Sequence, residues 1–196
     1  MTSTELDDCL VVVIDMHKGH IGPVATIPAP ASELDVMVPK LSNFLGEARK
    51  RNVPIVHVRF EAVKGIHNDH PAWIERWSDA HCLEGSPTTE FVLKPEKGDY
   101  VIESKRTYNC FAHTDLEIYL KRLHRHTVVI TGIATDCCCL ATAFGAIDLH
   151  YKVIAISDCQ VGMTPESSSA ALGIVADMLG KVMTSAQFLA ETRQYA

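Results

Sequence analysis

The chain has neither a long apolar run nor a basic stretch. No apolar run approaches the roughly 20 residues of a membrane-spanning helix, so we expect no membrane partner. Its 18 Lys and Arg are outnumbered by 24 Asp and Glu, for a net charge of −6, and they form no stripe. This makes nucleic acid an unexpected partner. The stretch 1–8 is polar and acidic, unlike a secretory signal.

The cysteine pattern also excludes several classes of protein. The seven cysteines include no C-x-x-C pair, so the sequence has neither a zinc-ribbon nor a thioredoxin-like motif. Three of them are consecutive, at 137–139, and adjacent cysteines bridge poorly to one another. We therefore expect free thiols and a cytoplasmic protein.

The remaining composition favours one α/β domain over residues 1–196. The chain is 47% apolar, which is enough for a sizeable core, and it has no repeat or linker. Apolar β-branched runs alternate with helix-length segments, which predicts a parallel sheet covered on both faces. We expect strands at 9–14, 54–60, 100–103, 127–131, 152–157 and 181–184, and helices at 32–52, 114–124, 138–149 and 165–180 and after 184.

One long segment, 61–98, does not follow this alternation. It is rich in His, Pro, Gly and Trp and has no clean period. Trp73 and Trp77 favour an ordered segment, and long loops in compact domains are usually functional. His67, His70 and His81 fall here, but their spacing fits no metal-ligand pattern.

Three polar residues follow three of the expected strands. Asp15 ends the first strand, Lys105 comes just after the third, and Cys138 lies in the turn after the fourth. Ligands of open parallel sheets bind beyond the carboxyl ends of the strands, so these side chains are expected to converge. A cysteine where a strand turns into a helix lies near backbone N–H groups and the positive helix end, which lowers a thiol pKa.

These residue types suit nucleophilic catalysis. Cys138 would attack a carbonyl carbon, and Asp15 would take the thiol proton and return it to the departing nitrogen. Lys105 would hold the carboxylate and favour the thiolate. Backbone N–H groups in the turn 134–138 would stabilise the oxyanion, a contribution of about 3 kcal/mol per donor.

Three blocks that contain these residues resemble the signatures of the isochorismatase-like cysteine hydrolases. They read VVIDM around Asp15, KRTYNCFAHTDL from Lys105, and GIATDCCCLATA around Cys138. The resemblance extends over roughly residues 9–185. It implies a three-layer α/β/α sandwich with a six-stranded parallel sheet in the order 3-2-1-4-5-6. It also implies an Asp15–Lys105–Cys138 triad and a cis peptide at Ile133–Ala134.

The resemblance further implies an activity and a setting for it. With the cysteine present, the expected reaction is hydrolysis of a small linear amide or ureide of the N-carbamoyl type, through an acyl-enzyme and with release of ammonia. Backbone N–H groups of Ala134 and Cys138 would form the oxyanion hole. No organic cofactor is implied, and a homo-oligomer, a dimer or a tetramer, is expected.

The sequence departs from the family pattern in two places. His17 replaces the glutamine that commonly follows the aspartate by two residues. The stretch after the second strand, VHVRF, lacks the Asp-x-His pair of metal-binding nicotinamidases, so we expect no metal. Arg59 could bind a substrate carboxylate or carbonyl, or form a structural ion pair. The candidate substrate contacts are His17, Arg59, Trp73, Trp77 and Tyr108.

Three alternatives stay open. The first is a metal-containing nicotinamidase-type amidase. The second is a family member that binds a small ligand without turnover, although the intact triad argues against it. The third is a redox role for the cysteines at 137–139.

Overall fold

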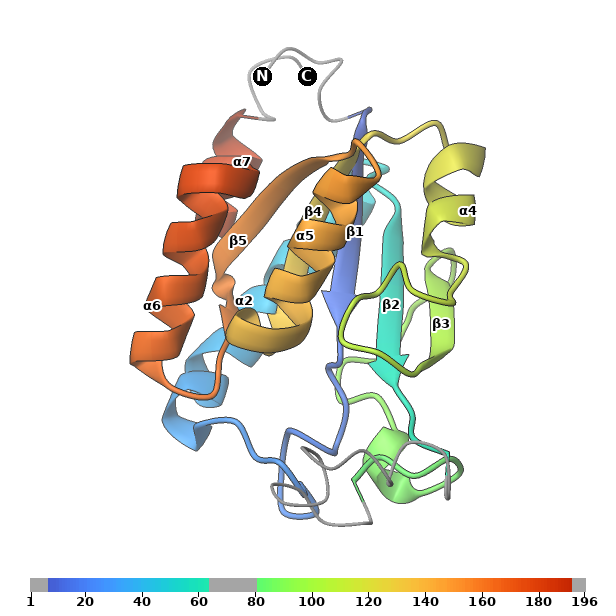
Figure 1. Ribbon diagram of the computed structural model, residues 1–196, viewed down its shortest axis with the longest axis vertical. Helices are drawn as coiled ribbons and strands as arrows, with labels where there is room; N and C mark the ends of the chain where they lie inside the picture. The colour runs from blue at the N-terminus through green and yellow to red at the C-terminus, as the bar shows by residue number, and fades with distance from the viewer. Residues whose placement is uncertain (1–6, 64–80, 192–196) are drawn as a thin grey trace.

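The computed structural model describes residues 7–63 and 81–191, and it confirms the predicted fold class. Six parallel strands form one sheet in the order β3-β2-β1-β4-β5-β6 (Figure 1). The strands are β1 (Cys9–Ile14), β2 (Ile55–Phe60), β3 (Tyr100–Lys105), β4 (Thr127–Ile133), β5 (Lys152–Val161) and β6 (Lys181–Met183). The helices are α2 (Ala31–Lys50), α4 (Leu116–Arg122), α5 (Leu140–Asp148), α6 (Pro165–Ile174) and α7 (Ser185–Glu191), with shorter turns η1 (Pro87–Thr89), η2 (Thr135–Cys139) and η3 (Val175–Leu179).

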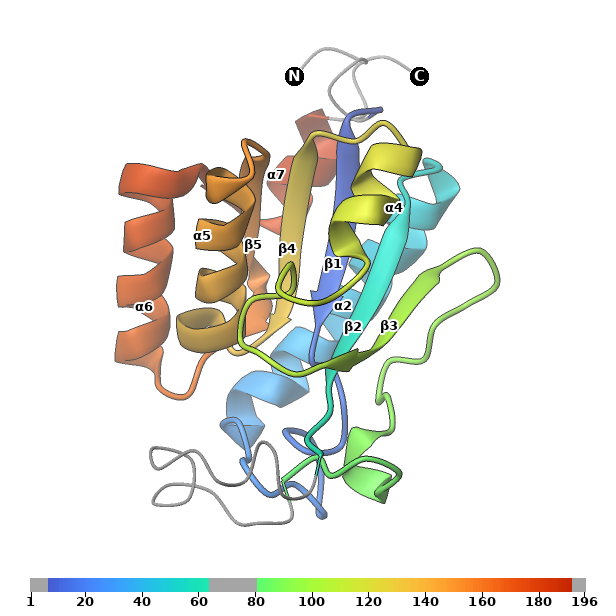
Figure 2. The ribbon, with the colours of Figure 1, turned by 45° about the vertical axis from the view of Figure 1, so that its right-hand side comes forward.

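Helices cover both faces of the sheet. In Figure 1, α5 lies in front of the sheet and α2 behind it, and Figure 2 shows the same layers from the side. Helices α2 and α7 share one face, where Phe44 and Phe188 pack edge to face with ring centroids 5.5 Å apart. Helices α4 and α5 and turn η3 contribute to the apolar cluster on the other face.

Strand β1 shows why the sheet needs both layers. Its six residues, CLVVVI, are all buried. Successive side chains of a strand point to opposite faces. Cys9, Val11 and Val13 accordingly join the cluster with α2, while Leu10, Val12 and Ile14 join the cluster with α4 and α5. A strand with both faces buried reads as a continuous apolar run.

The first turns of the helices are capped in different ways. Helix α2 begins after Pro30, and no side-chain hydrogen bond caps it. No capping box forms between Thr114 and Glu117, because Thr114 Oγ1 donates to the Cys110 carbonyl and accepts from the Leu116 N–H. Thr164 caps α6, with Ser167 as its partner in a capping box.

Two strands run further than expected. Strand β3 extends to Lys105, so this lysine ends the strand rather than following it. Strand β5 continues past Ser157 to Val161, because its register with β4 shifts between Ile130 and Gly132. The Gln160 amide donates to the Ile130 carbonyl at 3.0 Å and holds this irregular part of β5 on the sheet.

The carboxyl ends of β1 and β4 approach each other closely at Gly132. Its φ is +107°, and a Cβ there would lie 2.1 Å from the Ile14 carbonyl oxygen. Only glycine fits both conditions. Asp15, the residue directly after β1, has a φ of +50°. Aspartate tolerates this left-handed backbone conformation better than most residues do. The backbone therefore turns sharply where the candidate site begins.

None of the helices among the described residues combines the length and apolar character needed to cross a bilayer. All seven cysteines carry free thiols, as the cysteine pattern predicts.

Candidate active site

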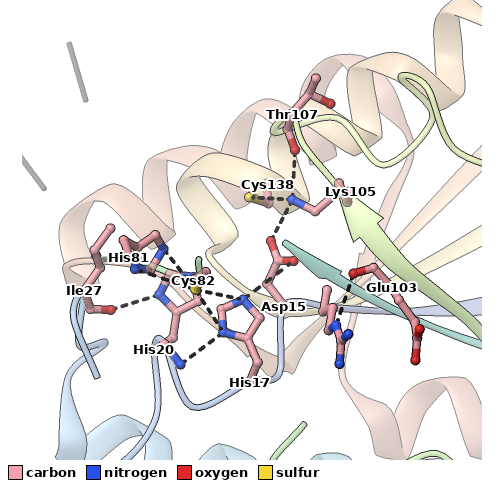
Figure 3. A network of polar contacts seen from close by, with 12 residues as sticks. Asp15, His17, His20, Ile27, His81, Cys82, Glu103, Lys105, Thr107 and Cys138 are labelled. Carbon is pink, nitrogen blue, oxygen red and sulfur yellow. Dashed lines mark hydrogen bonds and ion pairs between the residues drawn. The ribbon is translucent and has the colours of Figure 1, made fainter. Parts of the chain in front are cut away.

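The structure brings Asp15, Lys105 and Cys138 together at the carboxyl edge of the sheet. Lys105 Nζ lies 2.8 Å from Asp15 Oδ2 and 3.4 Å from Cys138 Sγ (Figure 3). The three residues come from the end of β1, the end of β3 and turn η2. Asp15 and Lys105 are fully buried and Cys138 is 7% exposed. The convergence predicted from the strand ends is thus observed.

Lys105 uses its full set of donors in this arrangement. An ammonium group has three N–H bonds. They are directed at Asp15, at Cys138 and at the Thr107 carbonyl, which accepts at 2.9 Å. Burial alone would lower the pKa of Lys105, but the nearby charge of Asp15 raises it above its ordinary value, so the side chain stays a cation.

The turn that carries Cys138 differs from the expected helix start. Residues Thr135–Cys139 form a π-helical turn, and α5 begins only at Leu140. The peptide Ile133–Ala134 before the turn is cis, as the resemblance implies. The Ala134 carbonyl accepts hydrogen bonds from the N–H groups of Cys137 and Cys139, both at 3.0 Å. The cysteine side chain is thereby held on a tightly bonded backbone.

The expectation of a lowered Cys138 pKa is wrong for this structure. A hydrogen bond with Cys137 and complete burial raise the pKa of Cys138 well above its ordinary value, and Lys105 opposes them only in part. Cys138 therefore rests as a neutral thiol. A nearby base is needed to take its proton, and Asp15 is the carboxylate in reach of the same ammonium group.

A cavity of about 60 Å³ opens beside this group. Asp15, Ala134 and Cys138 contribute to its wall, and its exposed lining is almost entirely apolar. Ile27, Phe60, Tyr108 and Met163 also line it. A volume far below the 300 Å³ or more of typical ligand pockets suits a substrate of few atoms.

Three histidines cluster against Asp15, and the sequence analysis did not find this cluster. The rings of His17 and His20 stack with centroids 4.8 Å apart, and His81 lies 5.3 Å from His20. Burial lowers the pKa of all three, and that of His81 falls to about 3. They are neutral at physiological pH. No sequence spacing could link His81 to residues more than 60 positions earlier.

The candidate substrate contacts separate into distinct groups. Tyr108 lines the cavity, whereas His17 is fully buried beneath it. Arg59 donates to the Glu103 carbonyl at 3.1 Å and lies 3.7 Å from Glu61, so it forms the structural ion pair rather than part of the cavity wall. Trp73 and Trp77, with His67 and His70, lie outside the described residues.

Among the described residues, no group of three or more His, Cys, Asp or Glu has the geometry to hold a metal ion. Each ring of the histidine cluster has its Nδ1 in a hydrogen bond. His17 Nδ1 accepts from the Gly19 N–H, His20 Nδ1 donates to the Ile27 carbonyl, and His81 Nδ1 bonds the Thr26 hydroxyl.

Comparison with known proteins agrees with this fold. The isochorismatase domain model matches residues 9–187. The uncharacterized isochorismatase family protein YwoC of Bacillus subtilis is 29% identical over 185 residues, 93% of each chain. The maleamate amidohydrolase of Pseudomonas putida is 24% identical over 189 residues, 95% of this chain and 87% of the relative.

Solved structures extend the agreement to three dimensions. An isochorismatase-like hydrolase from Alkaliphilus metalliredigens superposes with a TM-score of 0.79 and is 29% identical, with 94% of this chain and 98% of the other covered. The chain belongs to the isochorismatase family. It is a hydrolase, and its relatives in this family include amidohydrolases that act on C–N bonds.

Proposed function

We propose that the protein is a cysteine-dependent amidohydrolase for a small linear amide or ureide. The observation that carries the proposal is the position of Lys105, whose one ammonium group contacts both the Asp15 carboxylate and the Cys138 sulfur. A base and a nucleophile that share one buried cation can exchange a proton without moving apart. The small apolar cavity beside them supports a substrate of few atoms.

The first half of the reaction forms an acyl-enzyme. As Cys138 Sγ bonds to the amide carbon, its proton passes to the Asp15 carboxylate, and the carbonyl oxygen becomes an oxyanion. The N–H groups of Ala134 and Cys138 stabilise that oxyanion. When the C–N bond breaks, Asp15 returns the proton to the nitrogen, and ammonia leaves.

The second half regenerates the enzyme. Water attacks the thioester carbon while Asp15 again takes a proton, and the same N–H groups hold the second oxyanion. The C–S bond then breaks, Asp15 returns the proton to the sulfur, and the carboxylic or carbamic acid product departs. Lys105 remains a cation throughout and stabilises whichever partner carries the negative charge.

The substrate proposal draws on the cavity and on one relative. Neutral His20 and His81 and the apolar wall offer hydrogen bonds and packing but no full charge. The relative from Pseudomonas putida is named a maleamate amidohydrolase, which acts on a small linear amide. We extend that chemical class, rather than that compound, to this chain.

Ammonia release from a substrate panel tests the proposal. The panel includes maleamate, N-carbamoyl amino acids, biuret, ureidoacrylate-like acids and nicotinamide. We expect release by the wild type and none by Cys138→Ala. Cys139→Ala is the matched control, because Cys139 is a neighbouring buried thiol outside the cavity wall, and it is expected to keep activity. Equal release by the wild type and Cys138→Ala, or none from any compound, would overturn the proposal.

A further inference from the structure

His17 lies directly behind the candidate base. Its Nε2 is 4.0 Å from Asp15 Oδ1, and neither side chain has any exposed surface. Figure 3 shows the Asp15 carboxylate between the Lys105 ammonium group and the His17 ring. One carboxylate oxygen therefore faces Lys105 and the other faces His17.

The hydrogen bonds around His17 determine which of its nitrogens carries the proton. The Gly19 N–H donates to Nδ1 at 3.2 Å, so Nδ1 must present its lone pair. Burial lowers the pKa of His17 well below its ordinary value, so the ring is neutral and holds a single N–H. That N–H is then at Nε2, which lies 4.0 Å from Asp15 Oδ1 and 3.8 Å from the Cys82 sulfur.

Apart from Lys105, the Asp15 carboxylate has no hydrogen-bond donor among the described residues. Oδ2 has the ion pair with Lys105, and Oδ1 is without a hydrogen-bond partner in this part of the chain. A buried hydrogen-bond acceptor that has no donor destabilises the folded protein. At 4.0 Å the His17 contact is longer than a hydrogen bond, but such contacts in enzymes often shorten when substrate binds.

We propose that His17 is a positioning residue, whose Nε2–H closes onto Asp15 Oδ1 and holds the ionised carboxylate toward Cys138. The inference deepens the proposed function and rests on it. Because His17 is absent from the cavity wall, it acts through Asp15 and does not touch the substrate. Asp15 would thus have a cationic donor on one oxygen and a neutral donor on the other.

Other charged and titratable groups surround this pair. Neutral His20 and His81 are stacked or tilted against the His17 ring, and the Cys82 sulfur lies 3.7 Å from His17 Nδ1. The groups that face Asp15 or His17 from the packed elements are Lys105, Arg59, Glu61, His20, His81, Cys82, Cys110, Cys137, Cys138 and Cys139. Within the part of the chain that the structure describes, Oδ1 has no hydrogen-bond partner, and His17 Nε2 is the imidazole nitrogen that lies 4.0 Å from it.

The test compares variants that remove the donor with one that keeps it. His17→Met and His17→Leu lack any N–H in the side chain. His17→Gln keeps both functions, since its amide oxygen can accept from Gly19 and its NH₂ can donate to Asp15. Cys82→Ala is the matched control, because it changes packing against the same ring without removing a donor to the carboxylate.

The first measurement does not depend on knowing the substrate. Iodoacetamide alkylation of Cys138, located by tandem mass spectrometry, is followed against pH. Alkylation requires that the Asp15–Cys138 pair has released a proton to water, so the rate falls at low pH. Without the His17 donor the ionised pair is less stable, and we expect the midpoint of this fall to move up by about one to two pH units.

The pattern across the variants decides the matter. The expected result is a raised midpoint in His17→Met and His17→Leu, with His17→Gln and Cys82→Ala within about 0.3 units of the wild type. An unmoved midpoint in every folded variant, or a His17→Gln that behaves like His17→Met, would overturn the inference. If one donor-free variant does not fold, the other carries the comparison.

A parallel measurement separates this inference from the proposed function. On the best amide of the panel, the donor-free variants are expected to lower kcat at least tenfold at neutral pH, with KM within about threefold, because Asp15 is misoriented while the cavity is intact. A wild type that releases no ammonia, but whose His17 variants shift the alkylation midpoint, would refute the amidohydrolase and leave the role of His17 supported.

Discussion

Lys105 Nζ and Asp15 Oδ2 form an ion pair 2.8 Å long, and neither side chain has any exposed surface. Removing one member of a buried pair leaves an uncompensated charge, which typically costs about 3–5 kcal/mol. We therefore expect Lys105→Met to lower the free energy of unfolding by about that amount, measured by urea denaturation. The double variant Asp15→Asn with Lys105→Met should recover much of the loss while remaining inactive.

An exposed pair provides the control for this prediction. Lys121 and Glu117 lie 2.7 Å apart on the surface of α4. Exposed pairs contribute little to stability, so Lys121→Met should leave the unfolding curve nearly unchanged. A Lys105→Met protein as stable as Lys121→Met would contradict a stabilising role for the buried ion pair with Asp15.

The histidine cluster predicts a loss of stability in mild acid. Burial lowers the folded-state pKa of His17, His20 and His81, and for His81 the value is about 3, against about 6.5 unfolded. The unfolded chain then binds more protons as pH falls below 6.5. Stability is therefore present above that pH and is lost as pH falls toward the folded values, by up to about 1.4 kcal/mol per pH unit for each histidine.

Unfolding free energies measured near pH 7 and pH 5 check this slope. His81→Gln removes one of the three histidines, so it should reduce the slope of unfolding free energy against pH by at most about 1.4 kcal/mol per pH unit. His150→Asn changes an exposed histidine outside the cluster and serves as the control variant. Identical slopes in the wild type and His81→Gln would argue against a neutral His81 in the folded protein.

Gly132 is expected to tolerate no side chain. A Cβ at this position would lie 2.1 Å from the Ile14 carbonyl oxygen, and its φ of +107° strains any other residue. We expect Gly132→Ala to be recovered largely unfolded or insoluble. Gly173→Ala in α6 is the contrasting change, because its Cβ would meet nothing within 4 Å. It should raise stability by about 0.5–1 kcal/mol in thermal or urea unfolding.

Asp136 connects the nucleophile turn to the cavity wall. Its carboxylate accepts from the Met163 N–H at 3.2 Å and from the Ser167 hydroxyl, at the start of α6. We expect Asp136→Ala to lower stability by about 1–3 kcal/mol and also to raise KM, because Met163 lines the cavity.

Asp158 offers a matched control for that change. It accepts from the Ser185 N–H at 2.7 Å and from the Ser185 hydroxyl at 2.9 Å, at the start of α7, and it is absent from the cavity wall. Asp158→Ala should lose comparable stability with KM unchanged. If both variants raise KM equally, Asp136 has no special link to the cavity.

The parallel sheet and the meeting of Asp15, Lys105 and Cys138 could be predicted because both depend on features that the sequence displays, whereas the strand order was implied by the family resemblance. Buried parallel strands read as apolar runs, and the residues that follow them meet at one edge. The caps were less predictable. Thr164 caps α6, whereas Thr114 bonds a carbonyl in the preceding loop, a choice set by tertiary contacts.

Side-chain environment was harder still to predict. The pKa of the Cys138 thiol was expected to be lowered by its place at a helix start, but a hydrogen bond with Cys137 and burial raise it instead. The contacts of His17 with Cys82 and His81 join segments about 65 residues apart, and no period or motif marks them. Likewise, the pairing of Arg59 with Glu61 and Glu103 depends on how β2 and β3 align.

The three donors of Lys105 have a consequence for how this protein can evolve. They tie together the end of β1, the segment after β3 and turn η2, so that no one of these can change shape without the others. The cavity side chains Ile27, Tyr108 and Met163 make none of those bonds. Substitutions can therefore accumulate in the wall of the cavity while the reacting groups stay in place, and preference for a new compound could arise without loss of the underlying chemistry.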